Sequence, residues 1–86
     1  MDKEALFNQL IGLLEDLSVT VKYDRGNFTG GLFRYHEDNI FYVNRKEDID
    51  HKLQTIINEL KQLDIPQEML SVEIREAFPE LTQSTK

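Results

Sequence analysis

The chain has 86 residues, the size of one domain with one hydrophobic core. Hydrophobic residues make up 40% of it, with 4 glycines and 2 prolines, and this composition excludes a disordered or fibrous protein. The absence of cysteine excludes disulfides, zinc ribbons and thiol chemistry. No apolar run could span a bilayer, and residues 1–4 lack the features of a secretory signal, so we expect a cytoplasmic protein without membrane association.

Charge and aromatic residues are unevenly distributed along the chain. The net charge of −6 opposes binding to nucleic acids and to anionic membranes. Residues 22–46 nevertheless carry a net charge of +2 and hold six of the eight aromatic residues. The composition therefore favours this middle segment as the place for a binding surface.

Hydrophobic periodicity predicts the first two elements. Leucines at spacings of three and four indicate an amphipathic helix over residues 3–17, begun by Asp2. Apolar and polar residues then alternate over residues 19–23, which is typical of a half-buried strand.

The second half of the chain is predicted to be helical. Asn44 and Glu47 match the spacing of a capping box, and the apolar stripe behind them indicates a long helix over residues 45–63. Residues 64–66 should end this helix, because a residue that precedes proline avoids the α region. A shorter helix is expected over residues 67–78.

Two further strands, residues 32–36 and 40–44, should form an antiparallel hairpin across the turn-forming residues 37–39. Facing residues of a hairpin share a face, and here both faces are apolar. One face carries Phe33, Tyr35, Ile40 and Tyr42; the other carries Leu32, Arg34, His36, Phe41 and Val43. A sheet with one wet face would alternate apolar with polar residues, so this pattern predicts cover on both sides.

The predicted fold is a single α+β domain over residues 1–79, followed by a frayed tail at residues 80–86. Its elements follow the order α-β-β-β-α-α, with a small three-stranded antiparallel sheet packed on two main helices and a short C-terminal helix. Two helices can cover one face of the hairpin. We expect the aromatic face to contact another molecule, most simply a second copy in a twofold homodimer. The alternative is that the third helix and the glycine loop cover this face within one chain.

The loop between the first two strands is a second candidate site. Its glycines permit close backbone approach, and its flanking arginines could hold a small anion against backbone N–H groups. The residues of this possible anion-binding site are Arg25, Gly26, Gly30, Gly31 and Arg34. A phosphate loop normally precedes a helix, whereas this loop precedes a strand, so a tight connection between strands is the alternative.

The sequence contains no complete catalytic or metal site. A strand that ends in Asn44, followed by a helix, matches the layout of small zinc metallopeptidases, whose helix carries His-Glu-x-x-His. Glu59 matches the general base of that motif, but the amides Asn58 and Gln62 occupy the ligand positions, and an amide is a poor zinc ligand. We therefore predict no catalytic residue, no metal and no cofactor, and a metal-free relative of that scaffold is an alternative.

The glycine loop also carries a resemblance to a known family. Arg25-Gly26, Gly30-Gly31-Leu32-Phe33-Arg34, a strand ending in Val43-Asn44-Arg45 and the following long helix resemble a family of short bacterial proteins of unknown function, over roughly residues 19–75. In that family a cysteine often occupies the position of Phe33, so no thiol role transfers to this chain. The resemblance implies a bacterial cytoplasmic origin and no particular activity.

Together these features predict a non-enzymatic, self-associating interaction module whose contact surface is Phe33, Tyr35, Ile40 and Tyr42. One alternative is a regulatory domain that binds a small anion or ligand at residues 26–31. A single-stranded nucleic acid would suit aromatic residues beside basic ones, but the net charge opposes it, so no nucleic-acid partner is expected.

Overall fold

The computed structural model describes residues 2–63 and 65–81. Its elements, in chain order, are α1 (Lys3–Asp16), β1 (Thr20–Asp24), β2 (Gly31–Tyr35), β3 (Asp38–Asn44), α2 (Ile49–Leu60), the 3₁₀ helix η1 (Gln67–Met69), α3 (Val72–Ala77) and the 3₁₀ helix η2 (Pro79–Leu81). The predicted α+β class and element order are confirmed.

Helix α1 begins and ends where side-chain and backbone caps are available. The carboxylate of Asp2 accepts a hydrogen bond from the Ala5 N–H at 2.8 Å, which is the predicted N-cap. At the other end Ser18 adopts a left-handed φ of 68°, and the Val19 N–H reaches back to the Leu14 carbonyl. This arrangement is a Schellman cap, and it turns the chain directly into β1.

The sheet has the strand order β1-β3-β2. Strands β2 and β3 form the predicted antiparallel hairpin, but its turn consists of His36 and Glu37 and not of residues 37–39, and His36 has a φ of 57°. Strand β1, however, pairs parallel to β3, so the prediction of an all-antiparallel sheet is wrong and the sheet is mixed. Strand β3 is the longest and occupies the centre, between the other two. The alternation of apolar and polar residues indicates only that a segment is a strand. It does not indicate whether the neighbouring strand is parallel or antiparallel.

Helix α2 is shorter than the predicted span of residues 45–63. It begins after Asp48, whose carboxylate accepts from the His51 N–H at 2.8 Å, and it ends at Leu60. Asp48 therefore supplies the N-cap that the sequence analysis assigned to Asn44. Asn44 has a different role, described below.

The C-terminal part is also more divided than predicted. Instead of one helix over residues 67–78, η1 is followed by α3, which is capped by the Ser71 hydroxyl. Leu81 in η2 is buried in the core, so the prediction of a frayed tail is wrong for residues 80–81. Residue 64 of the predicted helix stop and residues 82–86 of the predicted tail lie outside the described residues.

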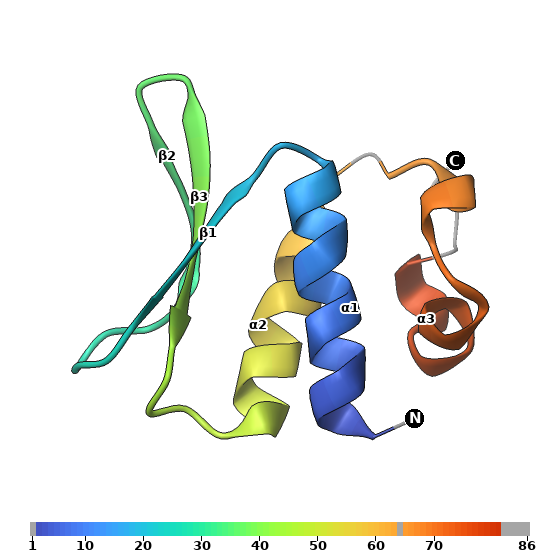
Figure 1. Cartoon of the computed structure of the whole chain (residues 1–86), viewed down its shortest axis with the longest axis horizontal. Helices are drawn as coiled ribbons and strands as arrows, with labels where there is room; N and C mark the ends of the chain where they lie inside the picture. The colour runs from blue at the N-terminus through green and yellow to red at the C-terminus, as the bar shows by residue number, and fades with distance from the viewer. Residues whose placement is uncertain (1, 64, 82–86) are drawn as a thin grey trace.

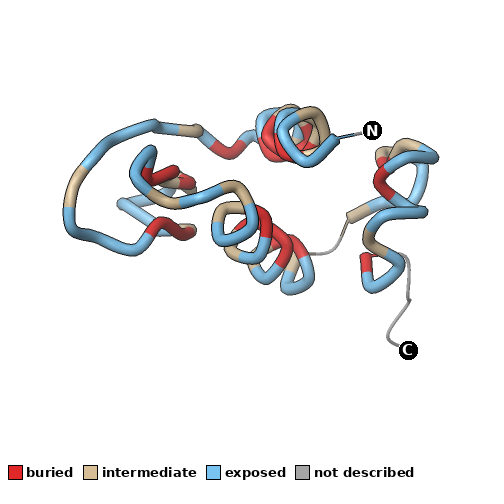
Figure 2. Tube along the Cα trace, turned by 90° about the horizontal axis from the view of Figure 1, so that it is seen from below, coloured by how far each residue is buried: buried red, intermediate tan, exposed pale blue. Residues whose placement is uncertain are grey.

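The elements form layers in which the sheet and α3 lie on opposite sides of the α1–α2 pair (Figure 1). The core fills the space among these layers, and buried segments run along both long helices and through the sheet (Figure 2). Its completely enclosed large side chains are Phe41, Leu10, Leu14, Ile56 and Leu60. Within the described ranges, no helix has the length and apolar character needed to cross a membrane.

Candidate interaction site

One face of the sheet packs on α1 and α2, and no helix of the described residues packs on the other. Phe41 and Val43 point toward α1 and α2 and are 1% and 2% exposed. Because residues alternate along a strand, the intervening residues of β3 point to the opposite side. We call that side the open face, and it carries the predicted interaction residues Phe33, Tyr35, Ile40 and Tyr42.

The observed register confirms that the four predicted interaction residues share a face. Phe33 pairs with Ile40, and the same side of the hairpin carries Tyr35 and Tyr42. Phe33 is 51% exposed and Tyr35 is 65% exposed, whereas Ile40 and Tyr42 are half-buried. The rings of Phe33 and Tyr42 meet edge to face, with centroids 5.7 Å apart. This surface is therefore a cluster of packed aromatic rings that remains accessible.

Helix α3 does not cover the open face. It packs against α1, on the side of the helix pair that faces away from the sheet (Figure 1). The alternative in which the third helix encloses Phe33, Tyr35 and Tyr42 is therefore wrong. Among residues 2–63 and 65–81, the glycine loop is the segment that reaches this face, and it covers the end near Asn44.

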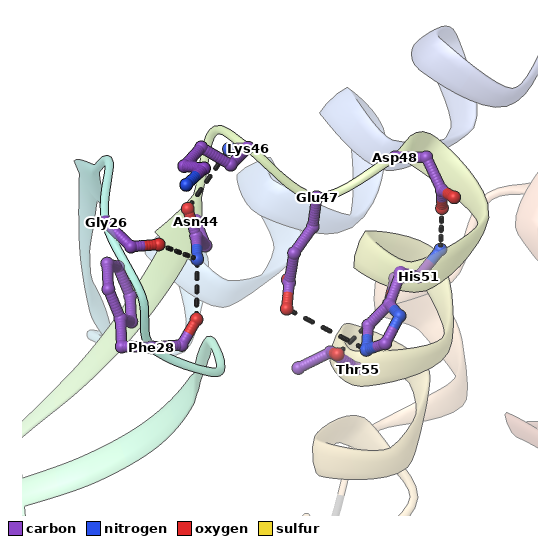
Figure 3. Close-up of polar contacts among 8 residues, drawn as sticks. All are labelled: Gly26, Phe28, Asn44, Lys46, Glu47, Asp48, His51 and Thr55. Atoms are coloured by element: carbon purple, nitrogen blue, oxygen red, sulfur yellow. Dashed lines mark hydrogen bonds and ion pairs between the residues drawn. The ribbon is translucent and has the colours of Figure 1, made fainter.

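Asn44 holds that loop in place, as Figure 3 shows. Its side-chain amide donates to the carbonyl oxygens of Gly26 at 3.0 Å and Phe28 at 2.5 Å, and its Oδ1 accepts from the Lys46 N–H. Asn44 is 4% exposed, so each of these bonds replaces water that the buried amide has lost. The loop is thereby fixed across the end of β3.

Gly30 lets the loop approach the sheet closely. A Cβ at this position would lie 2.7 Å from the backbone oxygen of Tyr42, well inside van der Waals contact. The requirement is one of space, because none of the described glycines has a positive φ. Asn44 and Gly30 together explain why the loop follows one path.

The fixed loop brings Phe28 onto the open face. The Phe28 and Tyr42 rings are 6.5 Å apart and nearly perpendicular. Phe28, Phe33, Tyr42 and Asp24 line a shallow, mainly apolar hollow of about 290 Å³. The Asp24 Oδ1 accepts from the Arg25 N–H at 2.8 Å, which fixes the carboxylate at the start of the loop.

The structure does not bring the predicted anion-binding residues together. Arg25 follows the Asp24–Asn44 pair at one end of the sheet, whereas Arg34 pairs with Asn39 beside the hairpin turn. Five positions along β3 separate these pairs, which corresponds to about 17 Å. The loop carbonyls are turned inward to Asn44, and no glycine has the left-handed φ of an anion-binding nest. No observation favours this site, and it stays a prediction.

The residues compared with a metallopeptidase helix also lie apart. Gln62 is beyond the last residue of α2, so Asn58 and Gln62 do not lie on one helical turn as paired ligands would. The Asn58 side chain accepts from Gln54 at 3.0 Å, and Glu59 is half-buried on the side of α2 near β2. Within residues 2–63 and 65–81, no group of three or more potential metal ligands gathers.

Tyr23 lies at the edge of the covered face, where it pairs with Val43. Partial burial raises the pKa of its hydroxyl, the nearby Glu15 carboxylate raises it further, and Arg45 opposes both. The Arg45 guanidinium lies over the Tyr23 ring, 5.4 Å from its centroid. This cation–π contact belongs to the end of the sheet and not to the open face.

The sequence analysis missed two members of the hollow, Phe28 and Asp24, because they stand in or beside a loop, where no periodicity assigns a face. The signal that could have found Phe28 is an apolar ring among glycines and polar residues, since such a ring has no strand or helix to bury it. The role of Asn44 was missed because a strand-ending asparagine before a helix also fits a cap.

Comparison of the chain with models of protein families, with curated proteins and with solved structures finds no match. The resemblance to a family of short bacterial proteins therefore stays a prediction. The candidate site has to be interpreted from its own geometry.

Proposed function

We propose that this protein is a non-enzymatic interaction module of the bacterial cytoplasm that self-associates through the open face as a twofold homodimer. The observation that carries the proposal is the exposure of Phe33 and Tyr35 beside Ile40 and Tyr42, on the sheet face that none of the described helices covers. Contiguous exposed apolar surface on a small protein commonly marks an interaction site. The bacterial origin follows from the resemblance, and the lack of cysteine suits a reducing cytoplasm.

The composition of the face supports a protein contact. Phenylalanine and tyrosine are enriched in the centres of protein interfaces, where they bury large areas at low conformational-entropy cost. A twofold axis would place the same aromatic patch of each copy against the other, so one surface would suffice for both sides. The open face extends past the end that the loop covers, because Tyr35 lies beside the hairpin turn, opposite Asp38, and is 65% exposed.

Light scattering of the purified protein tests this proposal. The wild-type chain should have about twice the monomer mass of 10.1 kDa. Tyr35→Glu should restore the monomer mass, because a carboxylate buried without a partner at an interface is strongly unfavourable. The matched control is Val72→Glu, which alters an apolar residue on α3 that is also more than half exposed and should leave the dimer intact.

Two results would contradict the proposal. One is a wild-type protein that remains monomeric at millimolar concentration. The other is a dimer that survives Tyr35→Glu and dissociates with Val72→Glu, because the contact would then lie on α3. Circular dichroism of both variants establishes that each is folded.

A further inference from the structure

Three aromatic residues, Phe28, Phe33 and Tyr42, line the hollow at the Asn44 end of the open face together with Asp24. Phe28 and Phe33 both contact Tyr42 edge to face, with interplanar angles of 83° and 69°. The rings therefore form walls at steep angles to one another instead of a flat stack. Asp24 supplies the one charged group of the lining.

Such a set of walls suits a cation. The face of an aromatic ring carries negative charge density, so several rings around one space attract a positive group. Asp24 adds a negative charge to this lining, which includes no basic residue. Charge complementarity thus favours a positive ligand over a neutral one of equal shape.

The lining further selects an alkylated ammonium group. A bare ammonium has three N–H donors that each require an acceptor, and the mainly apolar lining cannot supply them. A quaternary ammonium has no N–H donor, and its methyl groups can contact the rings directly. The volume of about 290 Å³ is at the lower end for small-molecule sites, which suits a headgroup rather than a larger ligand.

No described basic side chain of the protein lines this hollow. In the part of the chain that the structure describes, the cation–π contact is that of Arg45 with Tyr23, and none involves Phe28, Phe33 or Tyr42. Lys22 pairs with Tyr42 in the sheet but does not line the hollow. We propose that the hollow lined by Asp24, Phe28, Phe33 and Tyr42 is a binding site for a quaternary ammonium group.

This site goes beyond the proposed self-association, although the two share Phe33 and Tyr42. Tyr35 lies outside the hollow, so the Tyr35→Glu variant separates them: it should be monomeric and keep all four lining residues. Binding measured in this variant tests the hollow alone, whereas the mass of the wild-type protein tests the dimer alone. A negative result for the dimer therefore does not contradict the ammonium site, and a negative result for the ammonium site does not contradict the dimer.

The experiment is an NMR titration of the Tyr35→Glu variant with choline chloride. The expected result is an upfield ring-current shift of the choline N-methyl signal, together with shifts of the Phe28, Phe33 and Tyr42 ring signals. The neutral isostere of choline, 3,3-dimethyl-1-butanol, has the same shape without the charge and should bind at least several times more weakly. Binding should weaken as salt is added, because the attraction is electrostatic.

Substitutions then assign the site. Phe33→Ala should weaken choline binding by roughly two- to fivefold, as expected for the loss of one exposed cation–π contact. Asp24→Asn keeps the oxygen that accepts from the Arg25 N–H and removes only the charge. A roughly two- to fivefold loss of choline affinity in this variant would therefore show that the carboxylate acts through its charge. Val72→Ala, on α3, is the control and should leave binding unchanged.

A peptide that contains trimethyllysine, titrated in parallel, distinguishes the source of the group. Tighter binding of the peptide than of choline would assign a modified protein partner, and equal or weaker binding would assign a small molecule; both support the chemistry proposed. The proposal is overturned if choline causes no shift of the three rings, or if the neutral isostere binds as tightly as choline.

Discussion

The two faces of the sheet are built from the same strands and are equally apolar in sequence, yet they end in opposite environments. Phe41, on the covered face, is 1% exposed, whereas Phe33, on the open face, is 51% exposed and its neighbours Ile40 and Tyr42 are half-buried. The difference lies in the helices: α1 and α2 lie on one side, and α3 packs behind them instead of crossing to the other (Figure 1). An apolar strand face therefore becomes core or contact surface according to what the rest of the chain can supply.

The largest expected contrast between the faces is energetic. Phe41→Ala should lower the free energy of unfolding by about 3–5 kcal/mol, because it leaves a cavity in the core. Phe33→Ala should cost the monomeric Tyr35→Glu background less than about 1 kcal/mol, because the ring is 51% exposed. Urea denaturation measures both values, and Phe41→Leu, expected to cost about 1 kcal/mol, serves if the alanine variant does not fold. Equal losses at the two positions would show that the open face is core.

The end of the open face that the loop covers should depend on Asn44. Asn44→Ala removes the buried amide that donates to two loop carbonyls and should cost about 2 kcal/mol in unfolding free energy. Asn27→Ala, in the same loop but exposed, should change the stability by no more than about 0.5 kcal/mol. The Phe28 ring signal should also shift in Asn44→Ala. A loss no larger than that of Asn27→Ala would mean that the side chain does not hold the loop.

A pair of glycines tests the close approach of the loop. Gly30→Ala should destabilise the fold by about 1–3 kcal/mol, because the new methyl group would overlap the Tyr42 carbonyl. Gly12→Ala meets nothing within 4 Å and lies inside α1, so it should stabilise the protein by about 0.5–1 kcal/mol. Thermal denaturation of the two variants measures both stability changes, and the melting temperature should fall for Gly30→Ala and rise for Gly12→Ala. Stabilisation by both substitutions would disprove the packing described for Gly30.

The smallest effect concerns Tyr23 at the edge of the covered face. Its raised pKa means that the folded state holds the hydroxyl proton more tightly than the unfolded state, whose pKa is 10.0. This contribution to stability is complete below pH 10 and is lost as the pH rises through the raised pKa. The unfolding free energy of the wild type should therefore fall faster than that of Tyr23→Phe as the pH rises past 10.0, the pKa of the unfolded state. Parallel pH profiles would show that Tyr23 is as solvated in the fold as in the unfolded chain.

Much of this fold could be predicted because short-range patterns determine it. The leucine spacing and Asp2 define α1, and parity across the turn assigns Phe33 and Tyr42 to one face. The direction of β1 could not be predicted, because it depends on which strand occupies the centre of the sheet. The position of α3 could not be predicted from the sequence either, because it depends on packing between segments that are distant in the chain.

The candidate site was predictable in part for the same reason. The hairpin residues Phe33, Tyr35, Ile40 and Tyr42 follow from periodicity, but Phe28 reaches the face only through a loop. That loop is positioned by the buried amide of Asn44 and by the close backbone contact at Gly30. Neither contact produces a periodic pattern in the sequence.

The most direct test of the open face as a contact surface is isotope-filtered NMR on a sample in which half of the chains are labelled. Only contacts between different chains give signals in such a spectrum. The account predicts intermolecular NOEs from the Phe33, Tyr35 and Tyr42 rings to the same rings of the partner. A spectrum without intermolecular NOEs at millimolar concentration, or with NOEs confined to α3, would contradict it.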